Sequence, residues 1–399
     1  MKPVIKNLIL TFVVVCLVFL SGELALNIAA FLNSEKNGRG IQATKTKSLA
    51  EGVSENGSQA DQILNHVHVP GLQFTYTARD GKEFETIIKY NSKGLNDKEH
   101  PYAKPAGTAR IVILGDSFVE ALQVPRGQNF CEIIEKRLNA GNPAEKYETI
   151  NMGTSGYSPI LEYVYLKREG LKYEPDVVIL CFFMNDVHDD LIYKGMATFD
   201  NENLPISVSS GNADKTEKIK KTWKRAERRL CNSVKAVINR SKFYVFLKKR
   251  VYRLLEIADI RKSRPEENPY FILCKDPDPE KLALWKDTLR YILATKELAE
   301  RNGVKFLLVT IPVEGQLHGT VRCAVSRFYL KEKPYSDRYE KRIKSFCSRN
   351  GIDYLSLLLE FEESRAEGFY YKRDSHFNEK GHEEAAALIL KKLEKLGWV

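Results

Sequence analysis

The sequence lacks the cysteine and histidine patterns of a metal-binding domain. Its seven cysteines include no Cys-x-x-Cys pair, and none lies in a tight cluster with histidine, as a structural zinc site requires. We therefore expect no metal, and the motifs described below require no cofactor. Disulfides stay open, because neither their existence nor their pairing can be read from the sequence.

Recognised nucleic-acid-binding modules are also missing, although the chain carries a net charge of +10 at pH 7. The positive excess is local, because residues 215–264 contain 18 Lys or Arg and four Asp or Glu. Apolar residues recur through this segment as they do in amphipathic helices. Two interpretations follow: solvated helix faces, or a cap that contacts anionic lipid headgroups or an acidic polymer. Nucleic acid is not expected as a partner.

The N-terminus has the residue order of a targeting segment. Two lysines within the first six residues precede an apolar stretch over residues 7–32, which Glu23 interrupts. About 20 apolar residues span a bilayer, and the lysines favour a cytoplasmic N-terminus. We expect a signal anchor over residues 1–32, with the rest of the chain in the cell envelope or periplasm. The alternative is a cleaved signal peptide with residues 8–20 as its apolar region, which makes the protein secreted.

The rest of the chain divides by composition. Residues 33–66 are rich in Ser, Gly, Asn, Lys and Glu, which predicts a spacer. Residues 67–107 contain two short β-like segments on either side of Asp80-Gly81, which predicts a small β extension with a hairpin. Residues 108–399 form the main domain, and a basic helical insertion interrupts it at about residues 190–275.

Apolar runs of strand length alternate with helical patterns in the main domain. The runs are residues 111–114, 147–152, 176–183, 304–311 and 352–357, and the helical patterns cover residues 128–139, 159–169, 280–302, 334–349 and 378–396. Such alternation is typical of a parallel sheet with helices on both faces. The pattern predicts a doubly wound, three-layer α/β/α sandwich.

Polar residues suited to nucleophilic catalysis follow these apolar runs. Ser117 comes directly after the first run, at the carboxyl edge where open α/β sheets build their sites. A serine hydroxyl needs a base to remove its proton and a third group to orient that base. His376 precedes the last helical pattern and Asp374 lies beside it, so we expect a base and its acid there. The turns at residues 151–158 and 182–186 supply candidate donors for an oxyanion.

The order of these motifs resembles the SGNH/GDSL hydrolase superfamily over roughly residues 108–190 and 285–399. The matching blocks are Gly-Asp-Ser-Phe at residues 115–118, Asn151 with Gly156, Asn185-Asp186, and the Asp374/His376 pair. The resemblance implies a flavodoxin-like sheet, with Ser117 as nucleophile and His376 as general base. It also implies an oxyanion hole made of the backbone N–H groups of Ser117 and Gly156 and the side-chain amide of Asn185.

Two positions depart from the family pattern. Phe183 replaces the glycine of the third block, and we place it with His188 at the possible rim of the substrate pocket. The usual Asp-x-x-His has become Asp374-Ser375-His376, a spacing that also resembles alginate O-acetyltransferase-like relatives, in which the pair precedes the serine. The alternative to Asp374 as the acid is a Ser/His dyad aided by a backbone carbonyl.

These residues predict acyl transfer through an acyl-enzyme on Ser117. The first hypothesis is an esterase that deacylates an O-acylated envelope glycan or a lipid ester. The second is an O-acyltransferase that moves acetyl groups onto an exported polysaccharide. The third is a catalytically inactive scaffold that binds the envelope through the basic insertion.

Overall fold

The computed structural model describes residues 52–78, 81–141, 146–209, 279–317, 338–364 and 368–399. The predicted signal anchor, most of the predicted spacer and the basic segment at residues 215–264 lie outside the described residues. Of the helices that are described, none is both long and apolar enough to cross a membrane.

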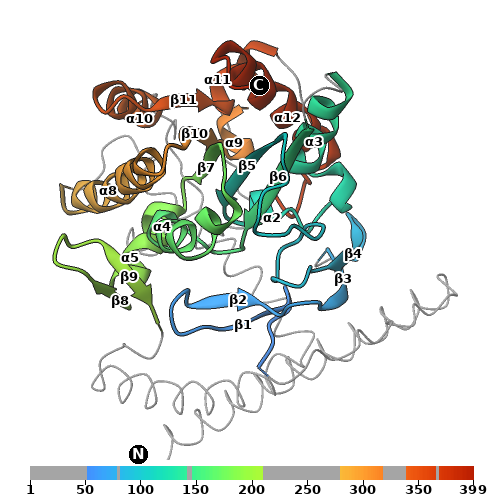
Figure 1. Ribbon diagram of the computed structural model, residues 1–399, viewed down its shortest axis with the longest axis horizontal. Coiled ribbons are helices and arrows are strands. Elements are labelled where there is room, and N and C mark those ends of the chain that lie inside the picture. The colour runs from blue at the N-terminus through green and yellow to red at the C-terminus, as the bar shows by residue number, and fades with distance from the viewer. Residues whose placement is uncertain (1–51, 79–80, 142–145, 210–278, 318–337, 365–367) are drawn as a thin grey trace, which may run out of the picture. The chain divides into compact units, whose positions relative to one another are not determined.

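A five-stranded parallel sheet forms the centre of the main domain (Figure 1). Its strands are β5 (Thr108–Gly115), β6 (Lys146–Gly153), β7 (Val177–Phe183), β10 (Lys305–Ile311) and β11 (Asp353–Ser356). Their spatial order is β11-β10-β7-β5-β6. Counted along the chain this is the 2-1-3-4-5 order of flavodoxin-like sheets, and it confirms the predicted parallel sheet.

The helices form two groups that cover opposite faces of the sheet (Figure 1). One group holds α3 (Phe130–Gly141) and α12 (Glu379–Lys395), and the other holds α4 (Pro159–Arg168), α5 (Asp186–Lys194) and α8 (Pro279–Arg301). Right-handed crossovers explain the division, because the chain moves outward from β5 to β6 and then back past β5 to β7. With both faces covered, all seven residues of β7 are buried.

Four further helices complete the described domain. They are α2 (Ser117–Glu120), α9 (Glu314–Leu317), α10 (Arg338–Arg349) and α11 (Leu357–Ser364). The helix α2 starts two residues after β5. From β5 the chain crosses to β6 on one side and then returns past β5 to β7 on the other side, so the direction of the crossovers reverses at β5. Open α/β sheets bind ligands outside the strand ends at such a point. The fold therefore places Ser117 where a site is expected.

An extension of short antiparallel strands precedes the main domain. Strand β1 (Ser58–Ala60) pairs with β2 (His66–His68), and β3 (Gln73–Thr77) pairs with β4 (Glu85–Lys89) as the predicted hairpin. The predicted spacer up to residue 66 is wrong in its last part. Leu64 is buried, and Asp61 accepts its N–H at 2.7 Å. Strands of three mostly polar residues carry too little hydrophobic alternation to be read from the sequence.

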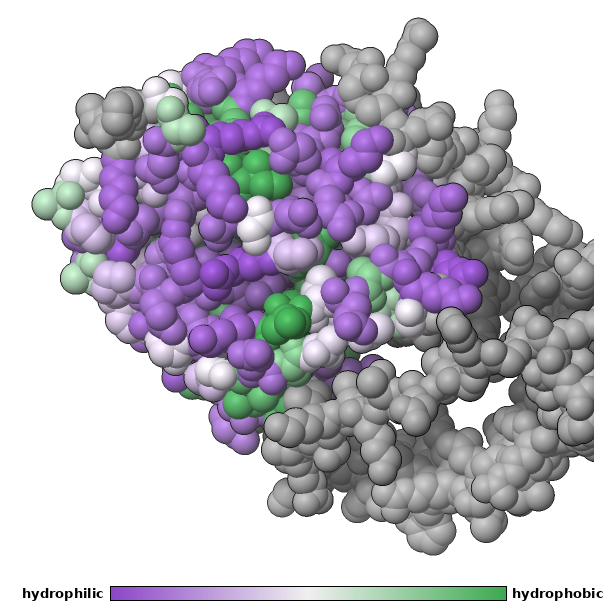
Figure 2. All heavy atoms as spheres, turned by 90° about the vertical axis from the view of Figure 1, so that its right-hand side faces the viewer, coloured by the Kyte–Doolittle hydropathy of each residue, from purple (hydrophilic) through white to green (hydrophobic). Residues whose placement is uncertain are grey.

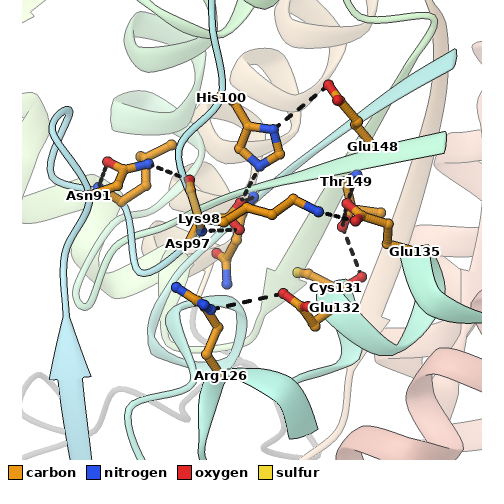
Figure 3. Close-up of polar contacts among 12 residues, drawn as sticks. Asn91, Asp97, Lys98, His100, Arg126, Cys131, Glu132, Glu135, Glu148 and Thr149 are labelled. Atoms are coloured by element: carbon orange, nitrogen blue, oxygen red, sulfur yellow. Dashed lines mark hydrogen bonds and ion pairs between the residues drawn. The ribbon is translucent and has the colours of Figure 1, made fainter. Parts of the chain in front are cut away.

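Carboxylates accept hydrogen bonds from β6, the last strand at one edge of the sheet (Figure 3). Asp97 of the extension accepts the backbone N–H of Asn151 at 2.8 Å, and Glu135 of α3 accepts that of Thr149 at 2.8 Å. Lys98 forms an ion pair with Glu135. These contacts fasten the extension to the main domain and satisfy donors that an edge strand leaves unpaired.

The described start of the predicted insertion is a hairpin, whereas the pattern predicted helices. Strand β8 (Ala197–Phe199) pairs with β9 (Pro205–Val208) after α5 ends at Lys194. Val208 also bridges Leu64 of the extension. The face shown in Figure 2 is mainly hydrophilic, with apolar side chains in small separate groups, because most apolar residues of the described chain are in the core.

Candidate active site

The turn after β5 presents Ser117 as the first residue of α2. Asp116 caps this helix by accepting the N–H of Phe118 at 2.9 Å. The end of β6 lies directly against α2, because a Cβ added to Gly153 would lie 2.2 Å from the backbone nitrogen of Glu120. Only glycine permits this approach, which fixes α2 between β5 and the turn after β6.

The nucleophile, base and acid predicted from the sequence lie in one hydrogen-bonded line. Oγ of Ser117 is 2.8 Å from Nε2 of His376, and Nδ1 of His376 is 2.5 Å from Oδ1 of Asp374. The side chains of His376 and Asp374 are 25% and 17% exposed, so solvent reaches the base while the acid is mostly covered. A carboxylate at Nδ1 favours the tautomer whose Nε2 accepts the serine proton.

A turn with one left-handed residue allows Asp374 to reach His376 across the short Asp-x-His spacing. Ser375 has a φ of +69°, a left-handed conformation that non-glycine residues adopt rarely. The turn closes through the N–H of Ser375 on the carbonyl of Tyr371 and the N–H of Tyr371 on the carbonyl of His376, each at 2.9 Å. We call residues 371–376 the acid loop. Its left-handed residue bends the chain so that Asp374 reaches the ring two positions ahead.

The two remaining oxyanion candidates follow strands at the same edge of the sheet. Gly156 has a φ of +81°, and its carbonyl accepts the hydroxyl of Tyr193 at 2.9 Å, a contact that holds this turn in place. Asn185 follows β7, and its amide donates to Asp189 at 2.8 Å. A primary amide has two N–H donors, so this contact fixes the side chain and leaves one donor.

The possible rim residues, Phe183 and His188, differ in burial. Phe183 is 7% exposed, and its ring centroid is 4.6 Å from that of Phe118, which is 4.9 Å from the ring of His376. Phe183 therefore packs on Phe118, the ring that contacts His376, and its place at the rim of the substrate pocket stays a prediction. His188 is half-buried on α5, with Nδ1 3.5 Å from Oδ1 of Asp189.

A buried ion pair supports the back of α2. Nε2 of His68 lies 2.9 Å from Oε1 of Glu120, and both side chains are buried. Glu120 also accepts the hydroxyl of Tyr90 at 2.8 Å and the N–H of Ser155, next to Gly156, at 2.7 Å. Burial alone would raise the pKa of Glu120, but the charge of His68 and these hydrogen bonds lower it overall. The extension, α2 and the Gly156 turn are thus joined by one carboxylate.

Four other carboxyl groups, those of Asp116, Glu162, Asp186 and Asp190, are buried in the main domain. Burial raises the pKa of Asp116 to about 6 and that of Asp190 to about 7. It also raises the pKa values of Glu162 and Asp186 well above the usual range, with repulsion from Asp116 adding to the effect in both cases. Burial thus favours the neutral form of each of these carboxyl groups.

In the part of the chain that the structure describes, no group of three or more His, Cys, Asp or Glu side chains is arranged to hold a metal ion. His382 is buried on α12. Burial lowers the pKa of His382 to about 3, with repulsion from His376 as a further cause. It is thus a neutral core residue.

The left-handed conformation of Ser375 and the His68–Glu120 pair were not identified from the sequence. Each depends on a contact between distant segments or on a backbone angle. The only sequence feature that could have indicated Glu120 and His68 is a polar residue inside an otherwise apolar or β-like segment. Many other positions share that feature.

No protein-family model and no curated protein sequence matches the chain. Several solved structures are similar at low identity. A two-domain esterase active on acetylated mannans is 12% identical, with 72% of this chain and 49% of that chain covered and a TM-score of 0.36. This chain thus spans about half of that esterase.

Two further similar structures are matched over most of their own length. A GDSL-like lipase from Bacteroides thetaiotaomicron is 14% identical over 72% of this chain and 89% of that one, with a TM-score of 0.34. An acetylxylan esterase from Geobacillus stearothermophilus is 11% identical over 71% and 94%, with a TM-score of 0.39. Similarities at this level assign neither a family nor an activity, so the functional conclusion rests on the site.

Proposed function

We propose that this chain is a serine-dependent carboxylic ester hydrolase that works through an acyl-enzyme on Ser117. One observation carries the proposal: the line from Ser117 Oγ through both ring nitrogens of His376 to Asp374, with contacts of 2.8 Å and 2.5 Å. Three side chains from opposite ends of the main domain meet in the geometry that activates a serine hydroxyl.

The reaction runs in two halves. Nε2 of His376 takes the proton of Ser117 as Oγ attacks the ester carbonyl, and the imidazolium then gives that proton to the leaving alcohol. In the second half His376 takes a proton from water, hydroxide attacks the acyl-enzyme, and the carboxylic acid leaves as the proton returns to Oγ. Asp374 holds the N–H of Nδ1 throughout and stabilises the positive ring.

The oxyanion of each tetrahedral intermediate needs donors beside Ser117. Ser117 is the first residue of α2, and the opening N–H groups of a helix have no acceptor within the helix. We assign this N–H, the N–H of Gly156 and the second amide hydrogen of Asn185 to the oxyanion hole. The contacts of Tyr193 with Gly156 and of Asp189 with Asn185 hold the latter two groups in place.

Hydrolysis is proposed over transfer to a sugar because the base is partly open to solvent, with a quarter of the His376 side chain exposed. Water at high concentration therefore competes for the acyl-enzyme. The substrate class that we propose is an O-acylated envelope glycan or a lipid ester outside the cytoplasm. This part rests on the N-terminal residue order of lysines followed by an apolar stretch.

The test is labelling of the full chain with a fluorophosphonate and hydrolysis of p-nitrophenyl acetate. Wild type should label and turn over, whereas Ser117→Ala should not label and His376→Ala should lose at least ~10³-fold in kcat. Ser92→Ala is the matched control, because Ser92 is an exposed serine bonded to Glu99 away from the site. Wild type that neither labels nor hydrolyses would favour the inactive scaffold.

A polysaccharide acceptor added to the same assay separates hydrolysis from transfer. Free acetate should form at the rate at which p-nitrophenol is released. If most of the acetyl group is recovered on the polysaccharide instead, the protein is an O-acyltransferase.

A further inference from the structure

The hairpin β3–β4 contacts the acid loop, although the two segments are about 290 positions apart in the chain. Oε1 of Glu83 accepts the backbone N–H of Arg373 at 2.9 Å. Oε2 of the same carboxylate accepts the N–H of Asp374 at 3.0 Å. One side chain thus holds two consecutive peptide groups, and the second of these groups belongs to the proposed catalytic acid.

The next residue of the hairpin strengthens this contact. The ring centroid of Phe84 is 5.0 Å from that of Tyr371, the residue at which the acid loop begins. Phe84 is buried, and Glu83 is half-buried. The hairpin therefore packs on the start of the acid loop through Phe84 and binds its middle through Glu83.

The acid loop needs such an external support. Its bend depends on Ser375 in a left-handed conformation, which costs an L-residue free energy and persists only when its surroundings impose it. The two hydrogen bonds within the loop fix Tyr371, Ser375 and His376. Those two bonds leave the Arg373–Asp374 segment, which aims the Asp374 carboxylate, to other contacts.

We propose that Glu83 is a positioning residue that orients Asp374, and through it His376, for the hydrolysis of esters at Ser117. The inference rests on the proposed function and extends it to a residue outside the main domain. A carboxylate accepts two N–H groups in fixed directions, so it sets the angle of the peptide that carries Asp374. A misplacement of about 1 Å in such a group costs roughly 10²-fold in rate.

The test compares wild type, Glu83→Gln and Glu83→Ala as full chains in p-nitrophenyl acetate hydrolysis. Glu83→Gln keeps the side-chain shape but presents an NH₂ group to one of the two N–H donors. We expect kcat to fall about tenfold in Glu83→Gln and about 10²-fold in Glu83→Ala, with KM within about twofold. Glu85→Gln is the matched control, because it removes the same charge from an exposed position two residues further along the hairpin, and it should behave as wild type.

A double-mutant cycle separates positioning from folding. If Glu83 acts through Asp374, Glu83→Gln should cost less than about twofold in an Asp374→Asn background. Effects that multiply in the double variant would show an independent structural role and overturn the inference. So would a Glu83→Gln enzyme with wild-type kcat. Wild type that hydrolyses no ester would overturn the proposed function, and this inference with it.

Discussion

Replacing Asp374 by Asn tests how much the acid contributes at its short spacing from the base. The substitution keeps the size of the side chain and removes its charge at a site where Oδ1 lies 2.5 Å from Nδ1 of His376. An amide nitrogen facing Nδ1 would also impose the tautomer whose Nε2 already carries a proton. That tautomer cannot accept the proton of Ser117.

The size of the effect follows from the charge on the ring in the transition state. Opposite charges centred about 4 Å apart interact by about 4 kcal/mol at an effective dielectric constant of ~20, the value for pairs near a protein surface. Each ~1.4 kcal/mol is a factor of ten, so kcat should fall about 10³-fold. The modest exposure of the two side chains, 25% and 17%, justifies that dielectric constant.

The assay is initial-rate hydrolysis of p-nitrophenyl acetate by the full chain near neutral pH, with kcat and KM measured separately. KM should change little, since Asp374 stabilises the charged ring and not the bound ester. Asp353→Asn serves as control, because Asp353 begins β11 and lies 3.7 Å from Lys392. A kcat for Asp374→Asn within threefold of wild type would refute the reasoning and favour the Ser/His dyad with a backbone carbonyl.

Three other predictions follow from the geometry. Ser375→Gly should keep its activity, since glycine adopts a positive φ freely, whereas Ser375→Val should lose about 1–2 kcal/mol of loop stability and turn over more slowly in the same ester assay. Asp190 has a folded pKa of about 7 against a usual 3.8, so the stability due to its neutral form is present below pH 4 and is lost as pH rises through 7. The free energy of unfolding should therefore fall between pH 4 and pH 9, and Asp190→Asn should make that fall smaller by up to about 4 kcal/mol. Urea titrations at the two pH values measure the difference, and an unchanged pH dependence would contradict this. Gly153→Ala should lose about 4 kcal/mol or more, because its Cβ would meet backbone atoms of Val119 and Glu120 at 2.5 Å and 2.2 Å; a thermal midpoint equal to that of wild type would show that α2 can move away.

The sheet was predictable because its strands are buried on both faces. Such strands read as continuous apolar runs, as in the Val-Val-Ile-Leu-Cys-Phe-Phe of β7, and the five predicted runs match the five strands to within a few residues. The order of the strands was implied only by the resemblance to SGNH/GDSL hydrolases, since the connection from β7 to β10 is too long to restrict it. Ser117 could be placed because the carboxyl edge of such a sheet is where side chains become free to react.

The support of the site was not predictable because it depends on contacts distant in sequence. Glu83 is one acid among many in the chain, and nothing near it indicates the acid loop. Ser375 is a common residue type whose backbone angle is set by the contacts around it. Phe183 shows the same limit, because its sequence position does not reveal that its ring packs on that of Phe118.

The hydrogen bond between Ser117 and His376 joins residues 259 positions apart. A ribosome makes Ser117 long before His376, and contacts between residues so far apart in the chain form slowly. The serine therefore stays without its proposed base until the later segment has been made and has folded. The proposed esterase activity should appear only when α12 and the acid loop dock, so its onset would report that docking.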